Sequence, residues 1–373
     1  MNGESSETES FIPPFDWQQH VVNPWSADGG IFDTVWIVLM AVCVITTCGL
    51  VGNYLILRRM ALVGDAISHS VLAGIAVVVV APFVFKSSLT HFHPGTTELF
   101  IGALVAGVFT TVLIELIHRY TRVKQDAAIG IAFTSLFALG VVLITVYVKK
   151  AHIDTGCILF GNFLEVGLDT TNVALSPGLA KTLGAHPHGA QFLMGNHELM
   201  LSSPVLRMAG VMGFAAILIF AFYKELLVSS FDPGLAVSLG IRANVVHYAL
   251  MCVLSLVVVS AFESVGAILA VAMLILPGAT AHLISARLPV IMALTVLHAL
   301  VASVLGFHLA VWWNVSVAGS LVVASTLLFA LAWLLSPHDG LLGHWYRQRR
   351  VRHEMPGNPS GELSGEQEAE PVA

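Results

Sequence analysis

The sequence predicts an all-α, polytopic integral membrane protein with about nine transmembrane helices. Of the 373 residues, 56% are hydrophobic and only 11% are charged. A soluble domain carries about a quarter charged residues. Apolar runs of about twenty residues recur along the chain, which is the length that spans a bilayer as a helix. Composition and run length together exclude a soluble globular domain.

Nine apolar segments are expected to form the membrane helices. They cover residues 35–57, 62–85, 99–117, 127–148, 205–223, 245–262, 264–286, 289–310 and 312–335. The sixth and seventh segments meet at residues 263–266, so they form either a tight hairpin or one broken helix. A total of eight or ten helices is therefore also compatible with the pattern.

The remaining segments divide the chain into three parts. Residues 1–34 form a polar N-terminal arm, and residues 35–335 form the transmembrane domain, with an outer insertion at about 168–203. Residues 336–373 form a tail that is first basic and then rich in Pro, Gly, Glu and Ser, a composition typical of disorder.

The positions of Lys and Arg predict the orientation. With the N-terminus outside, twelve of the 17 basic residues fall at cytoplasmic helix ends and five fall on the other side. Cytoplasmic loops carry the excess of Lys and Arg in membrane proteins. The N-terminus is therefore expected outside and the C-terminus in the cytoplasm.

The segment RRMALVGDAISHSVLAGIA, residues 58–76, carries two ionisable residues inside an apolar run, Asp65 and His69. Their four-residue spacing places both on one face of a helix. Such residues cost about 2.5–3.5 kcal/mol in a membrane helix, so they face a partner or a polar cavity. Carboxylate and imidazole groups are ligands of zinc and manganese. The spacing alone leaves open a packing pair, with Ser68 and Ser70 bonded to the backbone.

The string GDAISHSVLAG resembles the signature of the permease subunits of ABC importers for manganese, zinc and iron. KQDAAIG, FGN, FDPGLA and a VG turn followed by LPGATA extend the resemblance, in family order, over about residues 36–335. The family pattern has Pro where this chain has Ala73. Because Pro kinks a helix, the local bend of this segment is left open.

The resemblance implies the membrane-spanning permease subunit of an ATP-driven importer for zinc, manganese or iron. Such a subunit is not an enzyme and binds no permanent cofactor; the metal is its cargo, and ATP is hydrolysed by a separate cytoplasmic subunit. No GxxxxGK[ST] phosphate loop occurs in the chain. The implied partners are that ATPase, a second permease chain (identical or related), an extracytoplasmic metal-binding protein and the lipid bilayer of a bacterial-type plasma membrane. Nucleic acid is not among them.

A second motif follows the fifth apolar segment. Pro233 is expected to end the preceding helix, and the Asp232 side chain to cap a short helix. The resemblance implies that this segment docks onto the ATPase as a coupling helix; a capped loop between two membrane helices is the alternative. The residues assigned to coupling are Phe231, Asp232, Pro233, Gly234, Leu235, Ala236 and Gly240.

Histidines recur in the segments expected outside. They could collect metal, or they could be ordinary solvated loop residues, because an HxH pattern is a weak metal signal. The candidates are His91, His93, His152, His186, His188 and His197. The sequence does not fix the metal, although these histidines slightly favour zinc.

For transport, the hypothesis is that Asp65 and His69, from one or both permease chains, form a transient metal site that binds and releases the ion. The pair could instead latch a gate through a carboxylate–imidazole contact. An alternative function is a gradient-driven secondary metal carrier acting alone. A third is a membrane scaffold or receptor that senses metal through its outer histidines.

Overall fold

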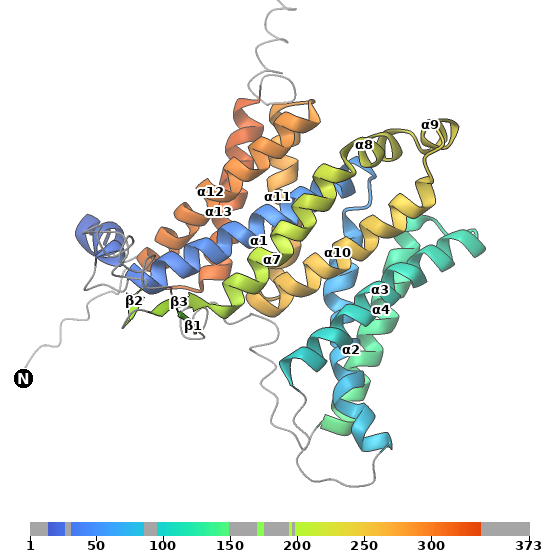
Figure 1. The fold of residues 1–373 in the computed structure, drawn as a ribbon, viewed down its shortest axis with the longest axis horizontal. Coiled ribbons are helices and arrows are strands. Elements are labelled where there is room, and N and C mark those ends of the chain that lie inside the picture. The colour runs from blue at the N-terminus through green and yellow to red at the C-terminus, as the bar shows by residue number, and fades with distance from the viewer. Residues whose placement is uncertain are drawn as a thin grey trace, which may run out of the picture.

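The computed structural model describes residues 14–26, 31–85, 95–148, 170–174, 194–195 and 198–336. Within these ranges nine long helices form a bundle (Figure 1). They are α1 (Ile31–Leu57), α2 (Leu62–Phe85), α3 (Thr96–Tyr120), α4 (Gln125–Leu143, continued by the π-turn η4, Ile144–Val148), α7 (Ser203–Ala221), α10 (Ala243–Val265), α11 (Ala267–Ile284), α12 (Leu288–Trp313) and α13 (Val317–Leu335). Eight are long and apolar enough to cross a membrane, and α11 is a shorter apolar helix. The predicted all-α polytopic class is confirmed.

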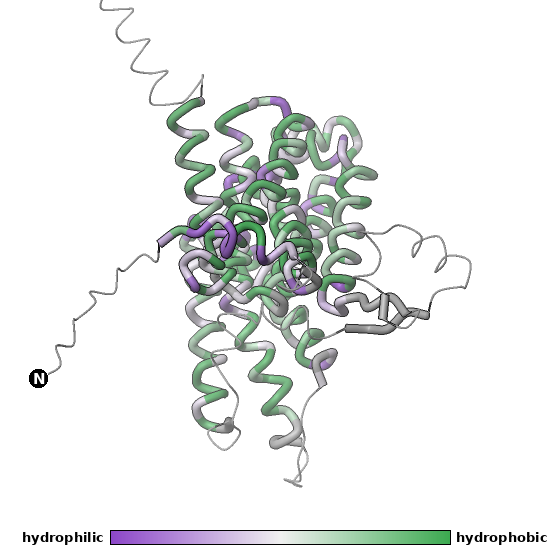
Figure 2. Tube along the Cα trace, turned by 90° about the vertical axis from the view of Figure 1, so that its left-hand side faces the viewer, coloured by the Kyte–Doolittle hydropathy of each residue, from purple (hydrophilic) through white to green (hydrophobic). Residues whose placement is uncertain are grey.

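The helices form two groups, and α1 lies in the first. In one group α1 packs against α7, α11 and α12, and α13 packs on α11 and α12; in the other, α2 packs against α3 and α4. Helix α10 contacts both groups (Figure 1). Of the most apolar stretch of α1, 78% is buried, against 22% for α4, α7 and α13. Helix α1 is therefore the most buried of the candidate spans, and Figure 2 shows that the helices are hydrophobic along most of their length.

Small residues let the central helices approach closely. A Cβ on Gly52 of α1 would overlap the carbonyl oxygen of Leu274 in α11. A Cβ on Gly74 of α2 would likewise overlap the carbonyl oxygen of Gly102 in α3. Close backbone approach at small residues is a usual way for membrane helices to associate, because lipid supplies no hydrophobic drive between them.

The sixth and seventh predicted segments are two helices joined by a turn. Helix α10 ends at Val265, and α11 begins at Ala267. Gly266 between them has φ +83°, a conformation that favours glycine. This decides between the two predicted alternatives in favour of separate helices.

Opposite ends of the bundle carry different short elements (Figure 1). One end carries α8 (Tyr223–Phe231) and α9 (Pro233–Ser238); we call it the α9 end. The other, the sheet end, carries the antiparallel strands β1 (Thr170–Ala174), β2 (Met194–Gly195) and β3 (Glu198–Ser202), in the order β1-β3-β2. This sheet lies in the predicted outer insertion and was not expected from the sequence.

Residues 14–26 differ from the loose polar arm that the sequence predicts. They form two short helical turns, η1 (Gln18–Val22) and η2 (Asn23–Trp25). The indole of Trp25 donates to Nε2 of His308 at 3.2 Å, and Nδ1 of His308 lies 3.0 Å from the carbonyl oxygen of His20. The rings of Phe15 and Trp312 are 5.3 Å apart. Aromatic contacts with α12 thus order part of the arm.

Candidate metal pathway and coupling segment

Asp65 and His69 lie in the first two turns of α2. Oδ1 of Asp65 is 3.4 Å from Nε2 of His69, and the two side chains are 42% and 37% exposed. The predicted i, i+4 pair therefore exists, on a face of α2 that the chain leaves partly uncovered. In an otherwise apolar span, such groups are expected to face a polar cavity or another chain.

Two aromatic side chains of α4 hold the imidazole of His69. Its ring centroid is 5.1 Å from that of Phe133 and 5.7 Å from that of Phe137. These contacts restrict the ring to orientations that keep it beside Asp65. Neither residue was predicted from the sequence. Their four-residue spacing on α4 was a visible signal, but nothing local linked it to α2.

The serines beside the pair are satisfied within the helices. Ser68 Oγ donates to the carbonyl oxygen of Gly64 at 3.1 Å, and Ser70 Oγ donates to that of Ile67 at 2.9 Å. Thr110 of α3 donates to Ser70 Oγ at 2.6 Å, which ties α3 to α2. Ser68 and Ser70 therefore serve packing, and Asp65 and His69 remain the metal-binding candidates on this helix.

One chain offers an incomplete metal site. Among the described residues, no group of three or more His, Cys, Asp or Glu side chains is placed to hold a metal ion. Stable zinc sites use three or four protein ligands. Two ligands on an open face suit an ion that passes through, or a site completed from elsewhere. The predicted metal-collecting residues His91, His93, His152, His186, His188 and His197 lie outside the described residues.

The coupling segment begins with the predicted cap. Oδ1 of Asp232 accepts from the backbone N–H groups of Gly234 at 2.9 Å and Leu235 at 3.0 Å. Pro233 occupies the first position of α9, where a missing N–H costs nothing. Phe231, directly before the cap, is exposed. The cap and the proline fix where α8 ends and α9 begins.

A glycine ends α9. Ile241 N–H donates to the carbonyl oxygen of Ala236 at 2.9 Å, and Gly240 N–H donates to that of Val237 at 3.0 Å. This pair of bonds is a Schellman motif, which needs a left-handed residue after the helix. Gly240 supplies it with φ +81°. Its place among the predicted coupling residues thus has a structural reason.

Helix α9 turns apolar side chains outward. Leu235, Val237 and Leu239 are 51%, 65% and 62% exposed, whereas Ala236 is fully buried. The helix lies outside the candidate membrane spans. These exposed apolar side chains make the segment a candidate interaction surface.

Arg58 joins the end of α1 to two other helices. Its Nε donates to Ser230 Oγ at 3.0 Å, and its Nη2 donates to Ser229 Oγ at 2.9 Å, both on α8. Its Nη1 lies 3.1 Å from Nδ1 of His247 on α10. Burial lowers the pKa of Arg58, whose ordinary value is far enough above physiological pH for the charge to remain. From the sequence alone, Arg58 was one of the twelve basic residues expected at cytoplasmic helix ends.

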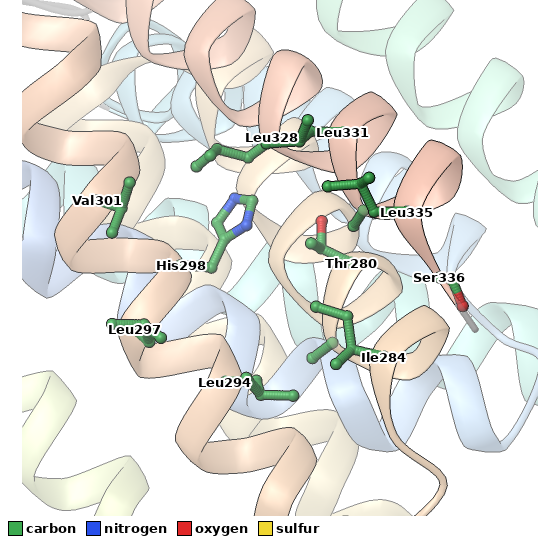
Figure 3. A pocket seen from close by; sticks show the side chains of 12 residues that line it. Thr280, Ile284, Leu294, Leu297, His298, Val301, Leu328, Leu331, Leu335 and Ser336 are labelled. Carbon is green, nitrogen blue, oxygen red and sulfur yellow. The ribbon is translucent and has the colours of Figure 1, made fainter. Parts of the chain in front are cut away.

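A pocket of about 370 Å³ lies among α11, α12 and α13, apart from the Asp65–His69 pair (Figure 3). The ring of His298 points into it, Thr280 and Ser336 also line it, and the remaining lining is aliphatic. Nε2 of His298 has no hydrogen-bond partner among the described residues. One imidazole without a carboxylate is a poor set of ligands for a divalent cation. The pocket lining therefore offers fewer metal ligands than the Asp65–His69 pair does.

The fold and the site together define a class of protein. A bundle of apolar helices, eight of them long and apolar enough to cross a membrane among the described residues, defines a multi-pass membrane protein. Comparison with known proteins gives the family. The sequence matches the ABC 3 transport family over residues 32–176 and 173–336, and the chain belongs to this family.

Curated relatives cover most of the chain. It is 38% identical over 322 residues to the manganese transport system membrane protein MntD of Bacillus subtilis, covering 86% of this chain and 98% of the relative. It is 37% identical over 322 residues to the zinc transport system membrane protein TroD of Treponema pallidum, covering 86% and 79%. The relatives thus differ in the metal that their names state.

A solved structure shares the fold. PsaBC from Streptococcus pneumoniae, determined in complex with Fab, superposes with a TM-score of 0.61 at 33% sequence identity. The match covers 84% of this chain and 94% of that chain. The chain is thus a multi-pass membrane permease of the ABC 3 transport family, a transport subunit rather than an enzyme.

Proposed function

We propose that this chain is the membrane-spanning subunit of an ATP-driven importer of divalent manganese or zinc, and that Asp65 and His69 line its metal pathway. The observation that carries the proposal is their partly exposed 3.4 Å pair inside a membrane span. The relatives named for manganese and zinc transport support this class of cargo. Iron, also implied by the sequence resemblance, has no support from the relatives named above.

The incomplete set of metal ligands in one chain supports the proposal that a second permease chain takes part. Two permease chains that face each other across the exposed side of α2 would bring two Asp65–His69 pairs toward one pathway. The four ligands would then match the coordination number of zinc. The site must also release the ion, so ligands on separate chains that move apart suit transport better than a rigid cage.

The exposed helix α9 supports the proposal that a separate ATPase subunit drives transport. Its apolar surface (Leu235, Val237 and Leu239) and its caps at both ends form a rigid, preformed docking element. In this proposal the ATPase binds α9 from the cytoplasm, and the N-terminus lies outside. The bias of Lys and Arg toward the α9 end supports this orientation. An extracytoplasmic binding protein would deliver metal at the sheet end.

The experiment that tests this function is transport by the complete complex in liposomes. The chain, its ATPase and its binding protein are reconstituted, and zinc and manganese uptake is measured with ATP inside or outside. Uptake that requires ATP on the α9 side supports the proposal. Uptake by the chain alone, driven by a proton gradient, would instead identify a secondary carrier. A sensor or scaffold would give no uptake under either condition.

A further inference from the structure

A chain of polar contacts at the α9 end links four helices through Arg58. The guanidinium reaches Ser229 and Ser230 on α8 and His247 on α10, at 2.9–3.1 Å. Both serines are buried. A guanidinium offers five N–H donors in a rigid fork, so three directed contacts fix its position and orientation.

His247 extends this chain to a fourth helix. Arg58 can only donate, so Nδ1 of His247 accepts, and the ring hydrogen lies on Nε2. Nε2 is 3.7 Å from Oε2 of Glu115 on α3. The imidazole therefore stands between a guanidinium and a carboxylate. The contacts run from α8 through the end of α1 and α10 to α3.

Arg58 also touches both supports of the coupling helix. Helix α9 packs against α8 and α10. These are the two helices that carry the partners of Arg58: Ser229 and Ser230 on α8, and His247 on α10. A displacement of α9 that moves either support must therefore move the guanidinium or break its hydrogen bonds. Breaking them would leave a partly buried charge without partners, which is costly.

Along the chain, Arg58 leads directly into α2, the helix that carries Asp65 and His69. The next residue, Arg59, turns the chain with φ +57°. Met60 N–H then donates to the carbonyl oxygen of Leu55 at 2.9 Å, and the Met60 side chain is buried. This connection is short and held at both ends, and α2 begins at Leu62. Motion of Arg58 is thus passed to the turn that carries Asp65.

We propose that Arg58 is a positioning residue that couples displacement of α9 to the start of α2, and so to the Asp65–His69 pair. The inference rests on the proposed function, because it takes α9 as the ATPase docking helix. Arg58 contacts neither metal nor ATP in this account. It acts by holding α8 and α10 to the α1–α2 connection, so that α9 and the start of α2 move together.

The test measures metal uptake and ATP hydrolysis in the same liposomes containing the complete complex. For Arg58→Gln, hydrolysis is expected to continue while metal transported per ATP falls about tenfold, within the usual range of coupling between two sites. Arg58→Lys keeps the charge but loses the planar fork of N–H donors. Its ratio of metal transported to ATP hydrolysed should therefore lie between those of the wild type and Arg58→Gln. The double variant Ser229→Ala/Ser230→Ala keeps Arg58 and should also uncouple. That variant decides the question if Arg58→Gln does not assemble.

The matched control is Arg59→Gln. Arg59 is the adjacent arginine and is exposed, and its side chain makes no hydrogen bond to a described residue; its backbone N–H donates to the carbonyl oxygen of Ile56, a bond that the substitution leaves in place. The substitution removes the same charge at the same helix end, and its transport ratio should equal that of the wild type. An equal loss in Arg59→Gln would overturn the inference, as would wild-type ratios in both Arg58→Gln and the double serine variant. If the wild-type complex itself shows no ATP-dependent uptake, the proposed function fails first.

Discussion

Oδ1 of Asp65 lies 3.4 Å from Nε2 of His69, one turn apart on α2. The position of the imidazole is not set by α2 alone, because its ring lies against Phe133 and Phe137 of α4. Packing between α2 and α4 therefore determines the geometry of the pair.

Gly140 of α4 lies close to the backbone of α2. A Cβ on Gly140 would lie 2.8 Å from the backbone nitrogen of Ala73, whereas a Cβ on Gly130 of the same helix would meet nothing within 4 Å. Gly140→Ala should therefore overpack the interface and cost about 1–3 kcal/mol. Gly130→Ala, the matched control, should be neutral or stabilising by up to about 1 kcal/mol, because Ala favours helix. Thermal unfolding of the purified protein in lipid distinguishes the two; equal melting temperatures would contradict the packing account.

Ala73 keeps α2 regular beside the pair. In an α-helix the N–H of residue 73 bonds to the carbonyl of residue 69, which here belongs to His69. The structure has α2 continuous from Leu62 to Phe85, so the bend left open by the sequence is not a break. Ala73→Pro should remove that bond, press the ring against α4 and cost about 3 kcal/mol.

A proline at the first position of the same helix provides the control. Leu62→Pro falls where helices tolerate proline, and Leu62 is exposed. Only Ala73→Pro should lower the melting temperature and the metal uptake. If Ala73→Pro transports and unfolds like the wild type, the straight helix at this position has no bearing on the pathway.

The cap of α9 gives a test of the coupling segment. Asp232→Ala removes the acceptor for two backbone N–H groups and should destabilise this short helix by about 1 kcal/mol. Asp232→Asn keeps a side-chain oxygen and should retain most of the effect of the cap. The affinity of the purified permease for its ATPase subunit should fall for Ala and remain near wild type for Asn. Equal affinities for the wild type, Asp232→Ala and Asp232→Asn would show that the cap does not contribute to binding of the ATPase.

The outer histidines can be tested as a group. If they collect metal, replacing them with Gln should raise the metal concentration needed for half-maximal uptake and leave the maximal rate unchanged. The residues to replace are His91, His93, His152, His186, His188 and His197. Uptake as a function of free zinc in cells lacking other importers measures both quantities. An unchanged concentration dependence would assign these residues to ordinary loop positions.

Local patterns predicted much of this protein, and tertiary contacts did not follow from them. Apolar runs located the nine helices, helical spacing paired Asp65 with His69, and the Asp–Pro sequence identified the cap of α9. The Arg58–His247 contact joins residues that are 189 positions apart. No periodicity or propensity links such residues, because their contact arises only when α1, α8 and α10 pack together.

The outer insertion also contains contacts that local sequence patterns do not predict. Its sheet pairs Thr170 with Ser202 across the predicted loop. Strand pairing over that separation depends on partners that local sequence does not identify. The contacts of residues 14–26 with α12 were missed for the same reason, because Phe15 and Trp25 find their partners about 300 residues away.

The measurement that tests the central claim most directly is uptake of radioactive zinc and manganese by cells carrying the complete transporter. Wild type is compared with Asp65→Ala and His69→Ala, and with the controls Asp33→Ala and His118→Ala, which remove exposed groups of the same kind elsewhere. Loss of a residue that only supports a metal ligand costs about 10–100-fold, so both α2 variants should lose at least tenfold at equal membrane abundance. The controls should transport as wild type does. Wild-type uptake by both α2 variants would show that the metal passes elsewhere and that the pair serves packing.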